Sequence, residues 1–135
     1  MNKILSTKYS AGAFNFAMLI LRVGVGILVA SHGYDKLVHF SAMKNHFMNF
    51  MGIGSTLSLT LVIFSEFFCS IFLILGLFTR LSVIPIIIGM SVALFKAHHG
   101  DMFGAGERAA IYIIALIAIL FCGPGRISID GAVGK

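Results

Sequence analysis

Two ionisable residues stand inside long apolar stretches of this sequence. Arg22 precedes His32 by ten residues, and Glu66 follows Leu57 by nine. If these stretches are neighbouring antiparallel helices, both side chains lie at the same depth to within about 2 Å, at ~1.5 Å rise per residue. A charge deep in a bilayer is costly, and it normally faces inward and pairs. We therefore predict an Arg22–Glu66 ion pair at the middle of the membrane. It either holds two helices in register or lines a cavity for protons or a polar headgroup.

The histidines form a second group of candidates, next to other polar residues. His32 lies in SHGYDK with Lys36, and His98 and His99 lie in KAHHGD shortly before Glu107. We expect these two ends to meet as an outer rim of polar side chains: His32, Lys36, His98, His99 and Glu107. Histidine changes charge near pH ~6.5 and ligates metals. Because no HxxxH or HExxH spacing occurs, we predict no metal site; the rim either handles protons or consists of ordinary interfacial histidines.

Neither the cysteines nor any glycine motif indicates a redox centre or a bound cofactor. Cys69 and Cys122 form no CxxC pair and fall at different depths, so they are predicted to be packing thiols. The single GxG, Gly24 to Gly26, lies inside an apolar stretch, where a phosphate-binding role is improbable. No haem, flavin or nucleotide motif is evident. The sequence therefore does not predict a stand-alone enzyme.

Composition indicates what must position these residues. Hydrophobic residues make up 59% of the 135-residue chain, charged residues make up 11%, and the mean hydropathy is +1.01. A soluble domain is about 45–50% apolar and about 25% charged. The apolar residues form four continuous runs, which predict helices and not the alternating strands of a barrel. We predict an all-α, single-domain membrane protein over residues 1–135, a four-helix bundle with helices near 13–37, 57–78, 81–97 and 107–123.

The N-terminus allows another interpretation, a cleaved signal peptide with Lys3 and Lys8 as its basic region. Arg22 interrupts the apolar stretch that follows, and three more apolar runs come after it. These features favour a retained first helix.

The connection after the first helix is predicted to contain a short amphipathic helix. In HFSAMKNHFMNFMG the apolar residues Phe40, Met43, Phe47, Phe50 and Met51 share one helical stripe. Such a segment is typical of a helix that lies in the outer interface of the membrane, and it could also cap or gate the bundle.

Orientation follows from the distribution of basic residues. With four crossings, one side carries Lys3, Lys8, Arg80, Arg126 and Lys135 with Asp130. The other side carries Lys36, Lys44, Lys96 and Arg108 with Asp35, Asp101 and Glu107. The first side is the more positive, so we predict an inner-membrane protein with both termini in the cytoplasm. The positive charge suits a membrane surface, because no basic cluster for nucleic acid occurs.

Three stretches resemble the DoxX family of small four-helix membrane proteins. They are LRVGVGILVASHGYDKL (21–37), Glu66 with ILGLFTR (74–80), and GERAAIY…CGPGRISIDG (106–131). Carried over residue by residue, the resemblance points to Arg22, His32, Gly33, Lys36, Glu66, either His98 or His99, Glu107, Gly123, Pro124, Gly125, Ser128 and Asp130. It also implies a membrane partner of redox systems, since the family takes its name from the small subunit of a thiosulfate:quinone oxidoreductase and relatives are linked with thiol and oxidative-stress systems.

Two functions remain open. The first is a redox-associated subunit that binds a quinone among helices one, two and four, with Arg22–Glu66 as anchor and a soluble or membrane oxidoreductase as partner. The second is a non-enzymatic module that binds or passes a small molecule or lipid, or scaffolds a partner protein. The C-terminal GPGRISIDG either caps the last helix, with Ser128 or Asp130 satisfying freed backbone groups, or docks a soluble partner.

Overall fold

The computed structural model describes residues 3–134, and all secondary structure in that range is helical. Lys135, counted above in the charge balance, lies outside the described residues. The first long helix is α1, Ala11–Val38. The second runs without a break through α3 (Ser55–Ile63), the π-helix η2 (Phe64–Phe68) and α4 (Cys69–Leu75). The third is α5 (Thr79–Val92) followed by the π-helix η3 (Ala93–Ala97), and the fourth is α6 (Glu107–Cys122). Short elements are the 3-10 helix η1 (Lys3–Leu5), α2 (Phe40–Met43) and α7 (Ile129–Ala132).

Three of these helical stretches are long and apolar enough to cross a membrane: Ala11–Val38, Ser55–Leu75 and Thr79–Lys96. Their outward faces carry large apolar side chains that the fold leaves exposed, such as Ile20, Leu61 and Ile88, and Ile114 of α6 is exposed in the same way. A belt of this kind is costly in water and is favourable in lipid. The expected all-helical membrane protein is confirmed. At 16 residues, α6 spans about 24 Å, less than the ~30 Å hydrocarbon layer.

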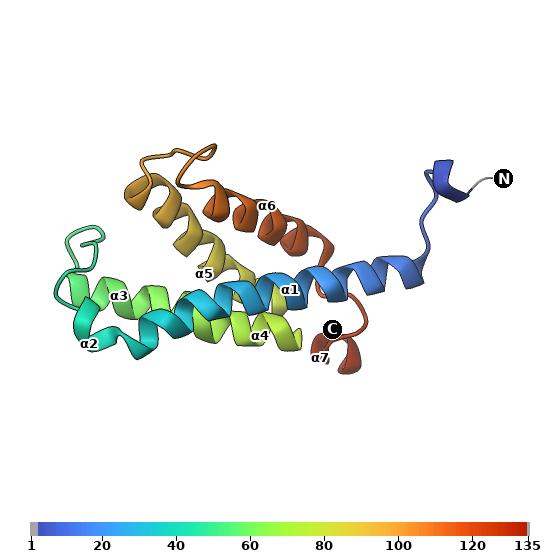
Figure 1. Cartoon of the computed structure of the whole chain (residues 1–135). Helices are drawn as coiled ribbons and strands as arrows, with labels where there is room; N and C mark the ends of the chain where they lie inside the picture. The colour runs from blue at the N-terminus through green and yellow to red at the C-terminus, as the bar shows by residue number, and fades with distance from the viewer. Residues whose placement is uncertain (1–2, 135) are drawn as a thin grey trace.

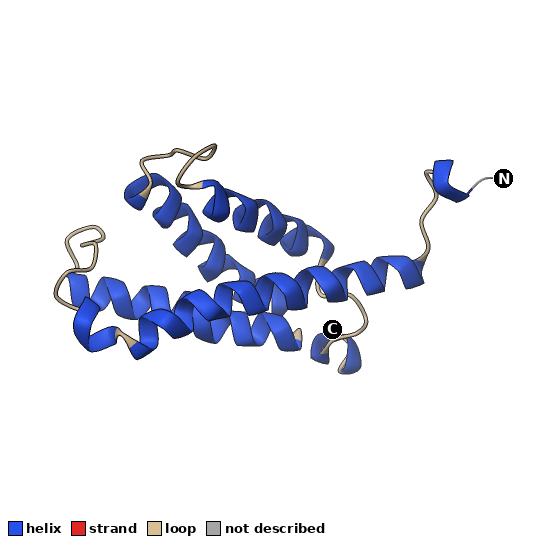
Figure 2. Ribbon diagram, viewed as in Figure 1, coloured by secondary structure: helices blue, strands red, loops and turns tan. Residues whose placement is uncertain are grey.

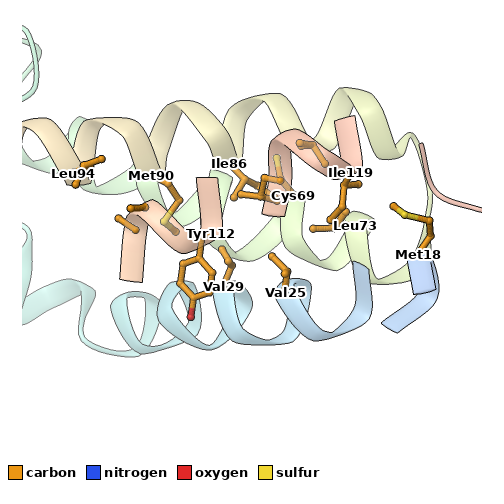
Figure 3. Close-up of a cluster of buried hydrophobic side chains, with 14 residues drawn as sticks. Met18, Val25, Val29, Cys69, Leu73, Ile86, Met90, Leu94, Tyr112 and Ile119 are labelled. Carbon is orange, nitrogen blue, oxygen red and sulfur yellow. The ribbon is translucent and has the colours of Figure 1, made fainter. Parts of the chain in front are cut away.

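The long helices pack around one apolar core (Figures 1 and 2). Val25 and Val29 of α1 meet Leu73 of α4, Ile86 of α5 and Ile119 of α6 (Figure 3). Both chain ends and the α4–α5 turn lie at one end of the molecule, which we call the proximal end (Figure 1). The α1–α3 and α5–α6 connections lie at the other end, which we call the distal end.

Two glycines set the register between α1 and the second helical stretch. A Cβ atom on Gly33 would lie 2.6 Å from the backbone nitrogen of Phe67, and one on Gly26 would lie 2.6 Å from the Ile74 side chain. The missing side chains let the backbones approach, as is usual for small residues between membrane helices. Gly33 therefore lies opposite the backbone of Glu66 and Phe67, and Gly26 lies opposite the C-terminal part of α4.

The prediction of an amphipathic helix after α1 is wrong about the length of the helix. Only Phe40–Met43 form a helical turn, and residues 44–54 form turns and bends. Met51, Gly52 and Gly54 have positive φ angles, which a right-handed helix does not allow. The segment is tied down by hydrogen bonds instead, among them Phe50 N–H to the Ser58 hydroxyl at 2.9 Å.

Candidate functional site

A cavity of about 630 Å³ opens at the distal end between the helices. We call it the distal cavity. Its polar lining comes from α1 (His32, Lys36), η2 (Glu66), the residue after η3 (His98) and α6 (Glu107, Arg108, Tyr112). Met90 and Ala93 of α5 and η3 and Ile111 of α6 add apolar surface. As expected, polar residues from the ends of the first and third helices, among them His32, Lys36 and His98, lie around one cavity.

The charged centre of this cavity is an ion pair between Lys36 and Glu66. The Lys36 Nζ donates to Glu66 Oε2 at 2.7 Å, and the two side chains are 22% and 6% exposed. Glu66 lies within the π-helix η2, a local widening of the helix that is frequent at functional sites. Gly33 allows this turn to lie against α1, within reach of Lys36 one turn further along.

The histidines divide between the cavity and the solvent. His32 lines the cavity and packs edge-on against Tyr112, with ring centroids 6.1 Å apart. His98 also lines it, whereas His99 has φ 54° and is exposed. The chain turns sharply at this point, since His98 N–H donates to Ala93 O and ends η3. Of the two histidines that the sequence left equivalent, the structure places His98 at the cavity.

Two lining residues, Arg108 and Tyr112, were not among the candidates from the sequence. Both belong to α6, where they are four residues apart and therefore share a helix face. Arg108 is adjacent to Glu107 in the sequence, and the i,i+4 spacing from Arg108 to Tyr112 was the signal that could have found both. Figure 3 shows Tyr112 extending from α6 towards α1, beside Val29.

The predicted Arg22–Glu66 ion pair is wrong. Arg22 is 2% exposed, and its guanidinium donates to three backbone carbonyls: Pro124 O at 2.7 Å, Ile127 O at 2.9 Å and Ile74 O at 3.4 Å. The predicted depth of Arg22 is counted from His32, but α1 continues past that residue to Val38. With the register set by Gly26 and Gly33, Arg22 faces the chain at the end of α4, while Glu66, midway along the second helical stretch, faces Gly33.

The C-terminal motif Gly123, Pro124, Gly125, Ser128 and Asp130 folds back over the proximal end of the bundle. Gly123, with φ 82°, ends α6, and Ser128 caps the short α7 by accepting from Gly131 N–H at 2.9 Å. The Asp130 carboxylate accepts from the N–H groups of Phe78 and Thr79, both at 2.9 Å. The motif is therefore a cap, as one of the two alternatives expected, but Asp130 caps the start of α5 and not the end of α6.

Neither cysteine forms a disulfide among the described residues. Cys69 is buried in the core and Cys122 is exposed at the end of α6. Within residues 3–134 no three histidine, cysteine, aspartate or glutamate side chains are grouped to hold a metal ion.

The fold, the apolar belt and the distal cavity define a helical membrane protein with a polar cavity at one end. The chain belongs to the DoxX family, whose model matches residues 17–99 and so confirms the family inferred from sequence. That match includes Arg22, Lys36, Glu66 and His98, and it ends before the C-terminal motif. An uncharacterized protein of Haemophilus influenzae is 28% identical over 127 residues, which cover 89% of this chain and 92% of that protein. No solved structure matches the chain.

Proposed function

We propose that this protein is a redox-associated subunit of the inner membrane whose distal cavity binds the headgroup of a quinone. The observation that carries the proposal is the convergence of the Lys36–Glu66 pair with His32, His98 and Tyr112 on one cavity. Intramembrane ionisable groups that line a cavity mark ligand sites and proton relays more often than simple packing. Membership of the DoxX family supports a membrane subunit of this kind.

The lining residues suit the chemistry of a quinone. Each of its two carbonyl oxygens accepts a hydrogen bond, and reduction to the quinol takes up two electrons and two protons. Lys36, Tyr112 and a protonated histidine are donors to such oxygens. The imidazole rings of His32 and His98 each carry one nitrogen that donates and one that accepts a proton. The electrons come from an oxidoreductase partner, so this chain binds the quinone and supplies protons.

We further propose that the chain crosses the membrane four times, with both termini in the cytoplasm. α6 packs along α5 and α1, and its polar first turn, Glu107 and Arg108, suits a position at the membrane interface. A short helix of this kind spans when its flanking residues snorkel or the bilayer thins. Lys8, Arg80 and Arg126 at the proximal end favour the cytoplasmic side for that end.

The experiment is to purify the protein from its native membrane in mild detergent and to identify bound small molecules by mass spectrometry. Glu66→Gln and His98→Gln remove groups that line the cavity, and His99→Gln is the matched control, because His99 is adjacent but does not line it. We expect stoichiometric quinone in the wild type and in His99→Gln, and at least a tenfold loss in the other two. Absence of quinone from the wild type, or equal retention in Glu66→Gln, contradicts the proposal.

A second candidate is non-enzymatic binding of a lipid or an apolar small molecule. The observation that favours it is an apolar cleft of about 280 Å³ between the second and third helical stretches, lined by residues such as Phe50, Leu61, Pro85 and Gly89. Stabilisation of the purified protein by an apolar ligand, with no change in redox state and no bound quinone, would favour this candidate.

A further inference from the structure

We propose that the proximal end holds a binding site for the phosphate group of an anionic phospholipid. A cavity of about 940 Å³ opens there between the start of α1, the start of α5 and the C-terminal segment. Arg80 and Arg126 both line it, together with Asn15. It lies at the opposite end of the molecule from the distal cavity, so this proposal does not depend on the proposed function.

The charge of the cavity is positive once internal pairing is taken into account. Asp130 is the acidic residue among its described lining residues, and it is 6% exposed. Its two carboxylate oxygens accept hydrogen bonds from the N–H groups of Phe78 and Thr79. The carboxylate also interacts electrostatically with the buried guanidinium of Arg22. The charges of Arg80 and Arg126 therefore remain to attract an anion.

The two arginines are held in place but keep donors free. The Arg126 backbone N–H donates to Asn15 Oδ1 at 3.0 Å, while its exposed side chain makes no hydrogen bond or ion pair with the described residues. Arg80 uses Nη2 to donate to Phe121 O at 3.2 Å, which leaves its other guanidinium N–H groups available. A guanidinium presents its donors in a planar fork that matches a phosphate.

The surroundings of the cavity indicate that the phosphate belongs to a lipid. Leu81 follows Arg80 in the chain, and Phe121 accepts the hydrogen bond from Arg80. Their side chains are apolar, and the two residues are 68% and 79% exposed. Phe14, which also lines the cavity, is partly exposed on α1. Apolar side chains next to basic ones are the arrangement that meets an acyl chain and a headgroup together, and basic pockets between membrane helices bind anionic headgroups.

The test is native mass spectrometry of the full chain in detergent. The protein is titrated with phosphatidylglycerol, with phosphatidylcholine of the same acyl chains, and with inorganic phosphate. The variants are Arg126→Gln, Arg80→Gln and the double variant. Lys96→Gln, an exposed charge removed at the distal end, is the control. We expect one phosphatidylglycerol to bind, about fivefold more weakly in each single variant, because a basic residue near the surface contributes about 1 kcal/mol to binding an anionic lipid.

The outcomes separate the alternatives. Binding that is lost in the double variant and retained in Lys96→Gln supports the site. Equal binding of phosphatidylcholine, or an unchanged affinity in the double variant, overturns it, because the contact would then be apolar only. If inorganic phosphate binds as tightly as the lipid, the proposal of a lipid ligand is overturned, and the site is one for a soluble phosphate. The Arg126 side chain makes no hydrogen bond or ion pair with the described residues, so Arg126→Gln should fold normally, and unaltered lipid affinity in that variant would also contradict the proposal.

Discussion

Arg22 and Glu66 are both buried charges, but they are stabilised in different ways. Glu66 has a cationic partner, Lys36, at 2.7 Å. Arg22 donates its hydrogen bonds to neutral groups, the carbonyl oxygens of three residues, and interacts electrostatically with the Asp130 carboxylate. One of the three, Ile74, lies at the C-terminal end of α4, where the helix dipole is negative. A guanidinium has five donors and can serve several carbonyls at once, whereas a carboxylate needs donors or a cation.

A double-mutant cycle separates the two arrangements. We expect Lys36→Met and Glu66→Gln to be coupled by about 1–2 kcal/mol in the free energy of unfolding, because each single change leaves the other group without its partner. Arg22→Gln and Glu66→Gln should add within about 0.5 kcal/mol, because they share no partner. Reversible unfolding in mixed micelles measures both. Coupling of Arg22 with Glu66 that equals that of Lys36 with Glu66 would contradict the register described here.

Arg22→Lys tests the carbonyl contacts directly. One ammonium cannot reach Pro124 O, Ile127 O and Ile74 O together, so we expect a loss of about 2 kcal/mol in unfolding free energy. We also expect faster cleavage within residues 123–134 by a protease added to the purified protein. Arg108→Lys, an exposed arginine at the distal end, is the control and should change neither. Stability and cleavage equal to those of the wild type would show that the fork of Arg22 does not hold the C-terminal segment.

At the scale of elements, the α1 contact with η2 and α4 positions both ends of the molecule. It places Glu66 beside α1, where it lines the distal cavity, and leaves Arg22 beside the end of α4 at the proximal end. The two π-helices have a related effect, since η2 contains Glu66 and η3 ends at His98. Glu66 and His98, the polar groups that these two helical stretches contribute to the distal cavity, therefore lie in or directly after a locally widened helix.

Two glycines of α1 offer a matched test of this contact. In Gly33→Ala the new Cβ meets backbone atoms of Glu66 and Phe67 at 2.6–2.7 Å, which cannot move aside easily. We expect a loss of about 1–3 kcal/mol in unfolding free energy and a weaker Lys36–Glu66 pair. Gly24→Ala lies on the same helix with nothing within 4 Å, and it should be neutral or stabilise by up to about 1 kcal/mol. Equal effects of the two changes would contradict the close approach at Gly33.

The whole molecule has two unlike ends. The distal end has a cavity lined by His32, His98 and an ion pair, and the proximal end has a cap held by Arg22 and Asp130. Because the two ends differ, the orientation of the protein in the membrane decides which compartment each cavity faces.

Cysteine labelling tests the proposed topology. In a Cys122→Ser background, cysteines are introduced one at a time at the exposed positions Thr7, Val133 and Asn45. A membrane-impermeant thiol reagent added to intact cells should label position 45 alone, and positions 7 and 133 should react only after the cells are opened. Labelling of positions 7 and 45 from the same side would exclude a crossing by α1. Labelling of position 133, but not of position 7, from outside would exclude an even number of crossings.

The sequence by itself determined the class of the protein and several local features. Continuous apolar runs can be buried only in lipid, so the helical membrane fold followed from composition and pattern. Gly123 and Pro124 predicted the end of the last helix, and the polar residues after the first and third runs predicted a shared rim. These features depend on neighbours in the chain.

The tertiary structure decided which charges meet. The partners of Arg22 and Glu66 depend on how far one helix slides along another, and no local pattern specifies that distance. Close approach at Gly26 and Gly33 sets it, which brings Glu66 to Lys36 and Arg22 to the carbonyls of the C-terminal segment. In the same way, His98 and His99 are equivalent in the sequence. They are separated by the turn that ends η3, where the left-handed backbone of His99 leaves its side chain exposed while His98 lines the cavity.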